Sequence, residues 1–185
     1  FGIDIDNRSI DENAIVNATV LDANLMPLSF REAIVNPQRR WNIVPRYDLA
    51  INDKNTLVVR YNWSRGSEEN QGIGNFSLPT RAYDTRDTDH TVQITETAVL
   101  SARAINETRL QYLRSRTSQL GDNTIATINV LDSFTGGGAQ VGNSYSNSDR
   151  WELHNNTTFT AGTHTLKFGS RVRTSSLSDA SPQNF

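Results

Sequence analysis

The stretch WELHNNTTFTAGTHTLKFGSRVR, from Trp151 to Arg173, decides the fold that this sequence predicts. Apolar and polar residues alternate before the Ala161-Gly162-Thr163 break, and the alternation resumes after it. A period of two residues is the pattern of a β-strand with one apolar and one polar face. The stretch therefore predicts a β-hairpin with a tight turn and arms of about ten residues.

Two further hairpins show the same alternation. Residues 41–65 reverse at Asn52-Asp53-Lys54-Asn55, and residues 90–116 reverse around 102–106. The remaining stretches show no sustained alternation of apolar and polar residues, so we predict that they are loops. The sequence thus predicts a single region, residues 1–185, with a strand end at 1–6, long loops at 7–40, 66–89 and 117–149, the hairpin at 150–173, and the start of another loop at 174–185.

Local signals qualify this outline. Ser29-Phe30-Arg31-Glu32 matches the capping box and predicts a single helical turn, which Asn36-Pro37 would end. Residues 124–131 resemble a strand inside the third loop. Pro45 lacks an N–H group and predicts a bulge or irregular pairing. Glu96 falls among apolar residues, which implies either a shifted register or a surface covered by something other than lipid.

Alternation alone fits both a membrane β-barrel and a soluble β-sandwich, since the strands of each are apolar on one face. The order of the connections favours the barrel. All the short turns fall at one end of the expected sheet and all the long loops at the other. Outer-membrane barrels have short periplasmic turns and long external loops. The predicted fold is all-β, an antiparallel up-and-down meander of about six to eight strands that forms an open section of a transmembrane barrel.

The tryptophans give an independent indication. Trp41, Trp63 and Trp151 all have the apolar parity, and all lie at the long-loop end of their strands. Indole has an apolar body and one N–H group, so it gathers at membrane interfaces. We expect a membrane-interface girdle, with Trp151 at the external end of its strand and Ala161-Gly162-Thr163 toward the periplasm.

The opposite parity carries charged and polar residues. In a barrel they would point into the lumen, where water, neighbouring groups or a plug satisfies them. We expect them to form a solvated lining, with substrate recognition left mainly to the loops. The predicted lumen-facing residues are Arg46, Asp48, Arg60, Glu107, Arg109, Lys167, Arg171 and Arg173.

Composition limits other functions. A net charge of −2 gives no pull toward nucleic acid, and the absence of cysteine excludes disulfides and thiolate sites. His90, His154 and His164 are too scattered for a metal pair, and no nucleophile, base and acid combine. We expect no enzyme activity, no cofactor and no nucleic-acid partner. The start at Phe1 suggests a processed protein or a fragment.

Several motifs resemble a known family. The units THTLKFGSRVR (163–173), INETRLQY (105–112) and NTLVVRYNWS (55–64) look like barrel hairpins of TonB-dependent outer-membrane receptors. The opening FGIDIDNRSIDENAIVNATVLD and PQRRWNIVPRYD are similar to the Oar-like type, which carries a carboxypeptidase-regulatory-like domain. The resemblance covers nearly the whole chain.

The resemblance implies a bacterial outer-membrane location and a barrel of twenty-two strands. It also implies that the barrel imports a scarce nutrient such as a metal chelate, oligosaccharide or peptide. The implied partners are outer-membrane lipid, a plug domain, the remaining barrel strands and the TonB complex. About seven strands do not close such a barrel, so we expect a section of one. The alternative is a soluble or surface-exposed β-sandwich or adhesin-like binding module.

Overall fold

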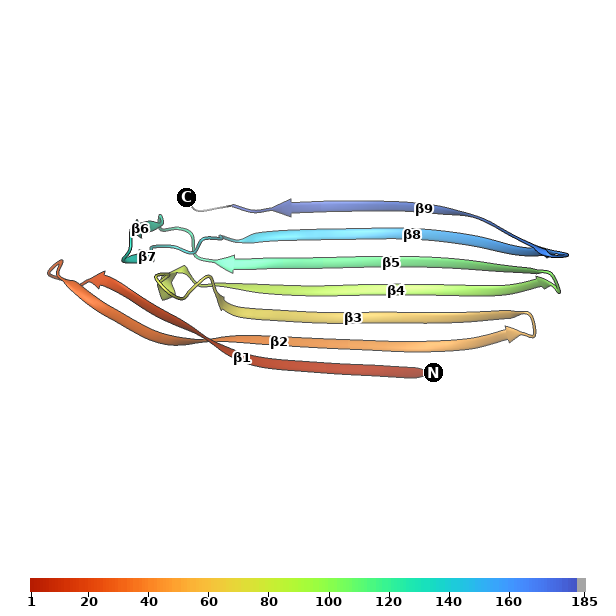
Figure 1. Cartoon of the computed structure of the whole chain (residues 1–185), viewed down its shortest axis with the longest axis horizontal. Helices are drawn as coiled ribbons and strands as arrows, with labels where there is room; N and C mark the ends of the chain where they lie inside the picture. Colours follow the sequence, from red (N-terminus) through yellow and green to blue (C-terminus); the bar gives the residue numbers. More distant parts are fainter. Residues whose placement is uncertain (183–185) are drawn as a thin grey trace.

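The computed structural model describes residues 1–182, which form one long antiparallel sheet and a small two-stranded one (Figure 1). The order in the large sheet is β1-β2-β3-β4-β5-β8-β9, and β6 pairs with β7. The strands are β1 (Gly2–Leu21), β2 (Pro27–Asn52), β3 (Asn55–Gln71), β4 (Tyr83–Ser101), β5 (Ala104–Gly121), β6 (Ile128–Val130), β7 (Phe134–Gly136), β8 (Ser144–Ala161) and β9 (His164–Ala180).

The predicted fold class is confirmed. Seven strands meander up and down, and each pairs with its neighbours in the sheet order, the edge strands β1 and β9 on one side only within residues 1–182. At one end the connections leave only two residues between paired strands, at 53–54, 102–103 and 162–163. Gly162 has a φ of 61°, a left-handed conformation that glycine adopts without strain, so the last turn reverses tightly.

The predicted long loop at 7–40 is wrong. β1 and β2 pair without interruption from Gly2↔Arg46 to Leu21↔Pro27, and only residues 22–26 connect them. Figure 1 shows this ribbon continuing past the ends of the other strands. The ribbon lacks apolar alternation because it extends beyond the part of the sheet that has one apolar face. Residues 29–32 are strand, since backbone pairing to β1 outweighs the local capping pattern.

The other loop predictions are too long for the same reason. β3 extends to Gln71 and β4 begins at Tyr83, which leaves only 72–82 of the predicted loop at 66–89. The loop at 117–149 shrinks to 122–143, and β6 keeps only three residues of the strand-like run 124–131. The segment predicted as a loop from 174 continues β9 to Ala180, and residues 183–185 lie outside the described part.

Two local predictions about register now have answers. Val44 and Pro45 are skipped in the pairing of β2 with β3, while the register is the same on either side, from Ile43↔Trp63 to Arg46↔Arg60. The pairing is therefore irregular at Pro45, without a bulge. No register shift occurs at Glu96, which pairs with Leu57 and Thr108. A shifted register does not explain that residue.

A small core lies at the long-loop end. The tip of the β1–β2 ribbon folds against the loops, with Asn17 N donating to Asn75 O at 2.7 Å and Thr19 N to Ser133 O at 3.1 Å. Val16 and Ala139 are completely buried there. We call this unit, residues 14–30, 72–82 and 122–143, the cap. It orders the loops that the sequence leaves without a pattern.

The short 3₁₀ turn η1 (Pro79–Arg81) supplies a charged residue to the cap. Arg81 is only 8% exposed, and its Nη1 donates to Thr127 Oγ1 at 2.6 Å and to Gly138 O at 2.9 Å. Arg81 therefore ties loop 72–82 to loop 122–143. Within residues 1–182 no helix is long and apolar enough to cross a membrane.

Candidate functional site: a two-faced wall and its charged groove

The register of the sheet separates one apolar face from one polar face. Tyr61, Val92, Tyr112 and Trp151 pair in one row across four strands, so their side chains lie on the same side. Tyr112 and Trp151 stack with ring centroids 4.3 Å apart. We call this side the apolar face. It also carries Ile3, Ile5, Trp41, Ile43, Tyr47, Leu49, Leu57, Val59, Trp63, Ile94, Leu110, Leu153, Phe159, Leu166, Phe168 and Val172.

The positions of the tryptophans shift along the strands from one strand to the next, as expected if the strands are tilted relative to the membrane normal. The row of Trp41 reaches β8 at Asn147, through Arg65, Thr88 and Arg116. Trp151 lies four residues beyond Asn147 after four strand steps. At about 3.3 Å per residue and about 4.8 Å per strand, a level line through both tryptophans makes an angle of about 35° with the rows. Barrel strands tilt by about 35–45°.

The short turns step by the same amount. β3 begins at Asn55, which is linked through Ala98 to Asn106, two residues inside the start of β5. The start of β5 is linked through Phe159 to Leu166, two residues inside the start of β9. Each interval covers two strands, so the turns also advance one residue per strand. Turns and tryptophans thus mark two parallel levels.

The distance between the two levels matches a membrane. Trp151 lies ten residues from Ala161, and Trp63 lies eight residues from Asn55. Eight to ten residues measure about 26–33 Å along a strand, or about 22–27 Å once a tilt of about 35° is included. The apolar band of an outer-membrane barrel is about 25 Å tall.

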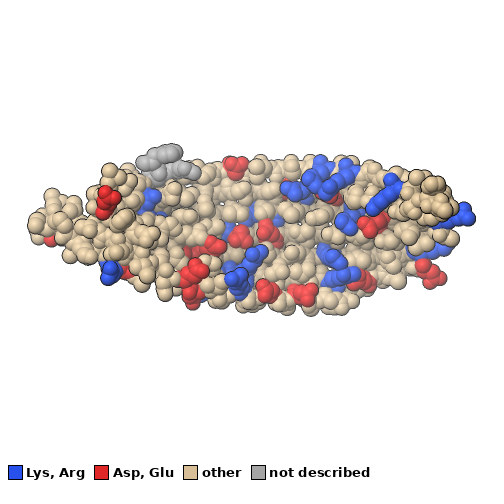
Figure 2. All heavy atoms as spheres, in the orientation of Figure 1, with Lys and Arg blue, Asp and Glu red and all other residues tan. Residues whose placement is uncertain are grey.

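The eight predicted lumen residues all lie on the opposite, polar face. Arg46, Arg60 and Arg173 share one row, and Asp48, Arg109 and Arg171 share the next. Glu107 and Lys167 follow in the rows nearer the turns. The structure thus places the eight side chains on one side and the three tryptophans on the other. Figure 2 shows positive and negative side chains interspersed along this face.

Several of these charges are paired. Arg46 Nη2 lies 2.6 Å from Asp48 Oδ1. Arg171 and Arg173 both contact the Glu152 carboxylate, at 2.7 Å and 2.8 Å. Glu152 was not among the predicted residues, although it has the same parity and stands between two arginines across the strand pair. These pairs neutralise part of the charge on the polar face nearer the short turns.

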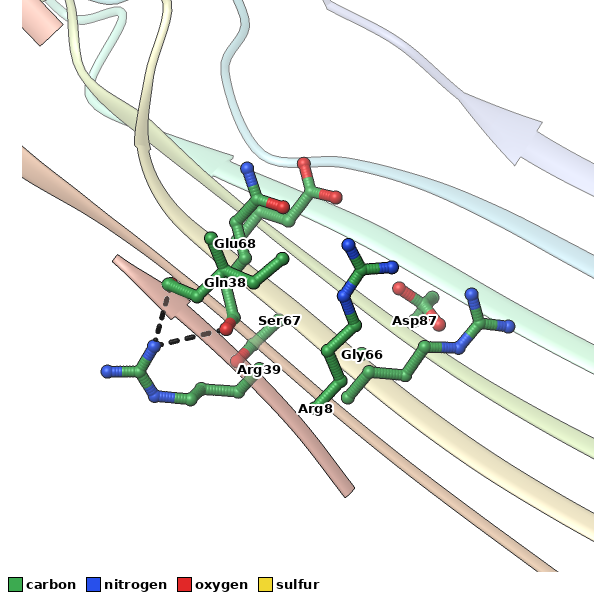
Figure 3. Close-up of a pocket in the computed structure, with 9 residues that line it drawn as sticks. Arg8, Gln38, Arg39, Gly66, Ser67, Glu68 and Asp87 are labelled. Atoms are coloured by element: carbon green, nitrogen blue, oxygen red, sulfur yellow. Dashed lines mark hydrogen bonds between the residues drawn. The ribbon is translucent and has the colours of Figure 1, made fainter. Parts of the chain in front are cut away.

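A charged groove lies further along the polar face, level with the tryptophans and beyond them. One hollow of about 210 Å³ is lined by Arg8, Arg40, Glu68 and Asp87. Figure 3 shows the Arg8 side chain extending over Gly66, between Glu68 and Asp87. A Cβ atom at Gly66 would collide with the Asp87 carboxylate, so glycine keeps this crossing open.

A second hollow of about 550 Å³ continues the groove and shares Arg8 and Arg40 with the first. Asn42, Asn62 and Asp89 also line it. We define the charged groove by these residues together with Glu68 and Asp87. It combines guanidinium, amide and carboxylate groups, which suits a polar solute with both donors and acceptors.

Sequence reasoning missed most of the groove. Arg8 and Arg40 fell in the predicted loop 7–40, and Glu68, Asp87 and Asp89 in the loop 66–89. Their strands are polar on both faces at this height, so no alternation marks them. The one signal that could have revealed the groove was the length of the segments between the hairpins, since each is long enough to extend two neighbouring strands.

A comparison with protein families shows what kind of sheet this is. Residues 7–185 match a family model described as an outer membrane beta barrel domain. The chain belongs to this family of outer-membrane β-barrels. Comparison with curated proteins and with solved structures gives no match.

Membership fixes the location and the broad role of the chain. The barrel section belongs in the outer membrane, as the resemblance implied. In barrels of this class the apolar band meets lipid, the short turns are periplasmic and the long loops are external. The charged groove then lies at the external mouth of the barrel, beneath the cap.

The histidines of this barrel section are dispersed. His90 lies on the apolar face beside Tyr61, with its Nδ1 2.7 Å from the Tyr61 hydroxyl, whereas His154 lies on the polar face. No group of three or more histidine, aspartate or glutamate residues within 1–182 is arranged to hold a metal ion. In the cap, hydrogen bonds from the hydroxyl and the backbone N–H of Thr124 lower the pKa of Asp122.

A polar cluster interrupts the apolar face of the barrel section. Asn155 Nδ2 donates to Thr108 Oγ1 at 2.7 Å, and Asn106 Nδ2 donates to Thr157 Oγ1 at 2.8 Å. The two amides also bond to each other at 3.1 Å. These groups satisfy one another, which lowers the cost of placing them in an apolar band. Glu96 adjoins the cluster through its pairing with Thr108.

Replacing Glu96 with leucine tests whether lipid covers this face. We expect Glu96→Leu to raise the free energy of unfolding in lipid vesicles by about 1–2 kcal/mol, because a carboxyl group is lost from the apolar band. Gln93→Leu, on the polar face of the same strand, is the matched control and should give no gain. A loss of stability in Glu96→Leu would show that Glu96 has a polar partner.

Proposed function

We propose that this chain is a section of the barrel of a TonB-dependent transporter that imports a scarce nutrient. The charged groove carries the proposal, because it presents guanidinium, amide and carboxylate groups at the external mouth. A metal chelate, oligosaccharide or peptide offers the polar groups that such a surface recognises. The resemblance of three hairpins to TonB-dependent receptors supports the same assignment.

The open edges of the sheet support a larger barrel. β1 and β9 each pair on one side only among the described strands. Unpaired backbone groups are costly in lipid, so membrane sheets close into rings. We propose that remaining strands of the parent protein extend both edges toward a barrel of the plugged, 22-stranded kind.

The proposed partners follow from the two faces. Outer-membrane lipid covers the apolar face, and a plug domain contacts the paired charges of the polar face. The TonB complex supplies energy through regions other than this sheet. We propose that the chain has no enzymatic activity, because the sequence brings no nucleophile, base and acid into one motif.

The sandwich alternative has no support in the fold. A sandwich buries its apolar faces between two sheets about 10 Å apart. Among residues 1–182 the second sheet is only the β6–β7 pair, which pairs with loops at one end. The apolar face of the large sheet stays exposed, with Trp151 at 49% and Phe168 at 62%.

Uptake measurements test the proposal. We expect cells that lack the protein to lose high-affinity uptake of one nutrient class under limitation. In wild-type cells, dissipation of the proton gradient should abolish that uptake. Arg8→Ala combined with Arg40→Ala should weaken uptake at low nutrient concentration, whereas Lys54→Ala in an exposed periplasmic turn should not. Uptake that continues without energy would indicate a passive pore and would contradict the proposal.

A further inference from the structure

A hollow on the apolar side of the wall has a lining unlike the rest of that face. It measures about 720 Å³ and is lined by Trp41, Trp63, Arg39, Arg65 and Arg86, with Ile43 toward the membrane. The two tryptophans belong to the girdle level, and the arginines lie beyond it on the external side. An aromatic floor and a cationic rim therefore meet at the height of the lipid headgroups.

The same arrangement repeats along three strands. Arg39 lies two residues beyond Trp41, Arg65 two beyond Trp63, and Arg114 two beyond Tyr112. A spacing of two keeps each arginine on the same face as its aromatic residue. The position just outside the girdle is thus cationic on β2, β3 and β5.

The arginines of the hollow differ in what they contact. Arg39 Nη1 lies 2.6 Å from Asp11 Oδ1, so this guanidinium already has an anionic partner. Arg65 and Arg86 are exposed, and their guanidinium groups make no ion pair or hydrogen bond with any side chain of residues 1–182. Glu69 also lines the hollow, so three guanidinium groups stand against one carboxylate.

We propose that this hollow binds the phosphorylated headgroup of an outer-leaflet lipid, with its acyl chain along Trp63 and Ile43. Guanidinium groups bind phosphate oxygens in pairs of charge-assisted hydrogen bonds. Tryptophan favours the boundary between headgroup and chain. The combination selects an anionic amphiphile, because a free phosphate uses only the rim and a neutral lipid only the floor. This site faces lipid and is separate from the proposed transport path.

Lipid retention tests the proposal on the complete outer-membrane protein. The purified protein in neutral detergent is mixed with lipopolysaccharide, with the same lipid after enzymatic dephosphorylation, or with inorganic phosphate. We expect the phosphorylated lipid to bind and the dephosphorylated lipid to bind at least about tenfold more weakly, since headgroup charge contributes at each arginine. Inorganic phosphate at millimolar concentration should compete poorly.

Matched variants assign the effect to the hollow. Arg65→Gln with Arg86→Gln should weaken binding of the phosphorylated lipid about tenfold to thirtyfold, given the contribution of each arginine near a membrane surface. Lys54→Gln with Arg103→Gln removes the same charge at the turn end and should leave binding unchanged. Equal binding of both lipids by the native protein would overturn the proposal even if the variants fold poorly. Inorganic phosphate that binds as well as the lipid would also overturn it.

Discussion

Leu110→Arg is expected to destabilise the protein by about 2–4 kcal/mol in a bilayer, because it places a cation near the middle of the apolar band. Leu110 lies six residues from the start of β5, between Ile94 and Leu153 on the same face. The two directly paired residues offer no anion to the new guanidinium. Glu96 lies one diagonal step away on the same face, so the substitution is made in the Glu96→Leu background. Denaturant unfolding of the complete protein in lipid vesicles measures the change.

The adjacent residue gives a matched control. Gln111 lies on the polar face of the same strand, paired with Gln93 and with Glu152. Gln111→Arg adds the same cation beside a carboxylate, so we expect a change within about 0.5 kcal/mol, as for most surface substitutions. Equal effects of the two substitutions would contradict the assignment of the faces.

Arg81→Met is expected to loosen the cap by about 3 kcal/mol. The substitution keeps an unbranched side chain but removes the donors to Thr127 Oγ1 and Gly138 O, and unpaired buried groups are costly. A loss of about 3 kcal/mol corresponds to about a hundredfold increase in local opening. Limited proteolysis of loops 72–82 and 122–143 should speed up by that factor.

Arg103→Met is the control, because Arg103 lies in an exposed turn at the opposite end; it should leave the cleavage rate of the cap unchanged. The strands should be insensitive to Arg81→Met, so denaturant unfolding of the barrel should be unchanged in that variant. A cleavage rate equal to that of the native protein would show that the cap is held by the ribbon contacts at Asn75 and Ser133 alone.

The parts of the wall that cross the membrane were predictable from single residues. Trp63, Tyr61, Val59 and Leu57 lie on the apolar face, and Arg60 and Asn62 between them lie on the polar face, so polarity alternates with a period of two. The same contrast predicted the hairpins, their short turns and the side on which Arg46 and Arg173 lie. A membrane requires an apolar and a polar face on every strand, so the alternation can be recognised in the sequence.

Beyond the membrane the difference in polarity between the two faces of the sheet disappears. At the height of Arg8, Gly66 and Asp87 both faces of the sheet meet polar surroundings, and the residues alternate in no recognisable way. Long-range backbone pairing, such as Val16 with Glu32, extends the strands there. Sequence analysis assigns such segments to loops, because the energy of strand pairing depends on the partner strand and not on the local pattern.

By itself the sequence determined the all-β meander, the hairpins around residues 52–55, 102–106 and 161–163, and the two opposite faces. Apolar alternation, loop order and the tryptophans contain that information. Only the tertiary structure decided the lengths of the strands, the cap held by Arg81, the charged groove and the arginine hollow. Each of these assembles residues far apart in the chain, and their proximity depends on the register between strands.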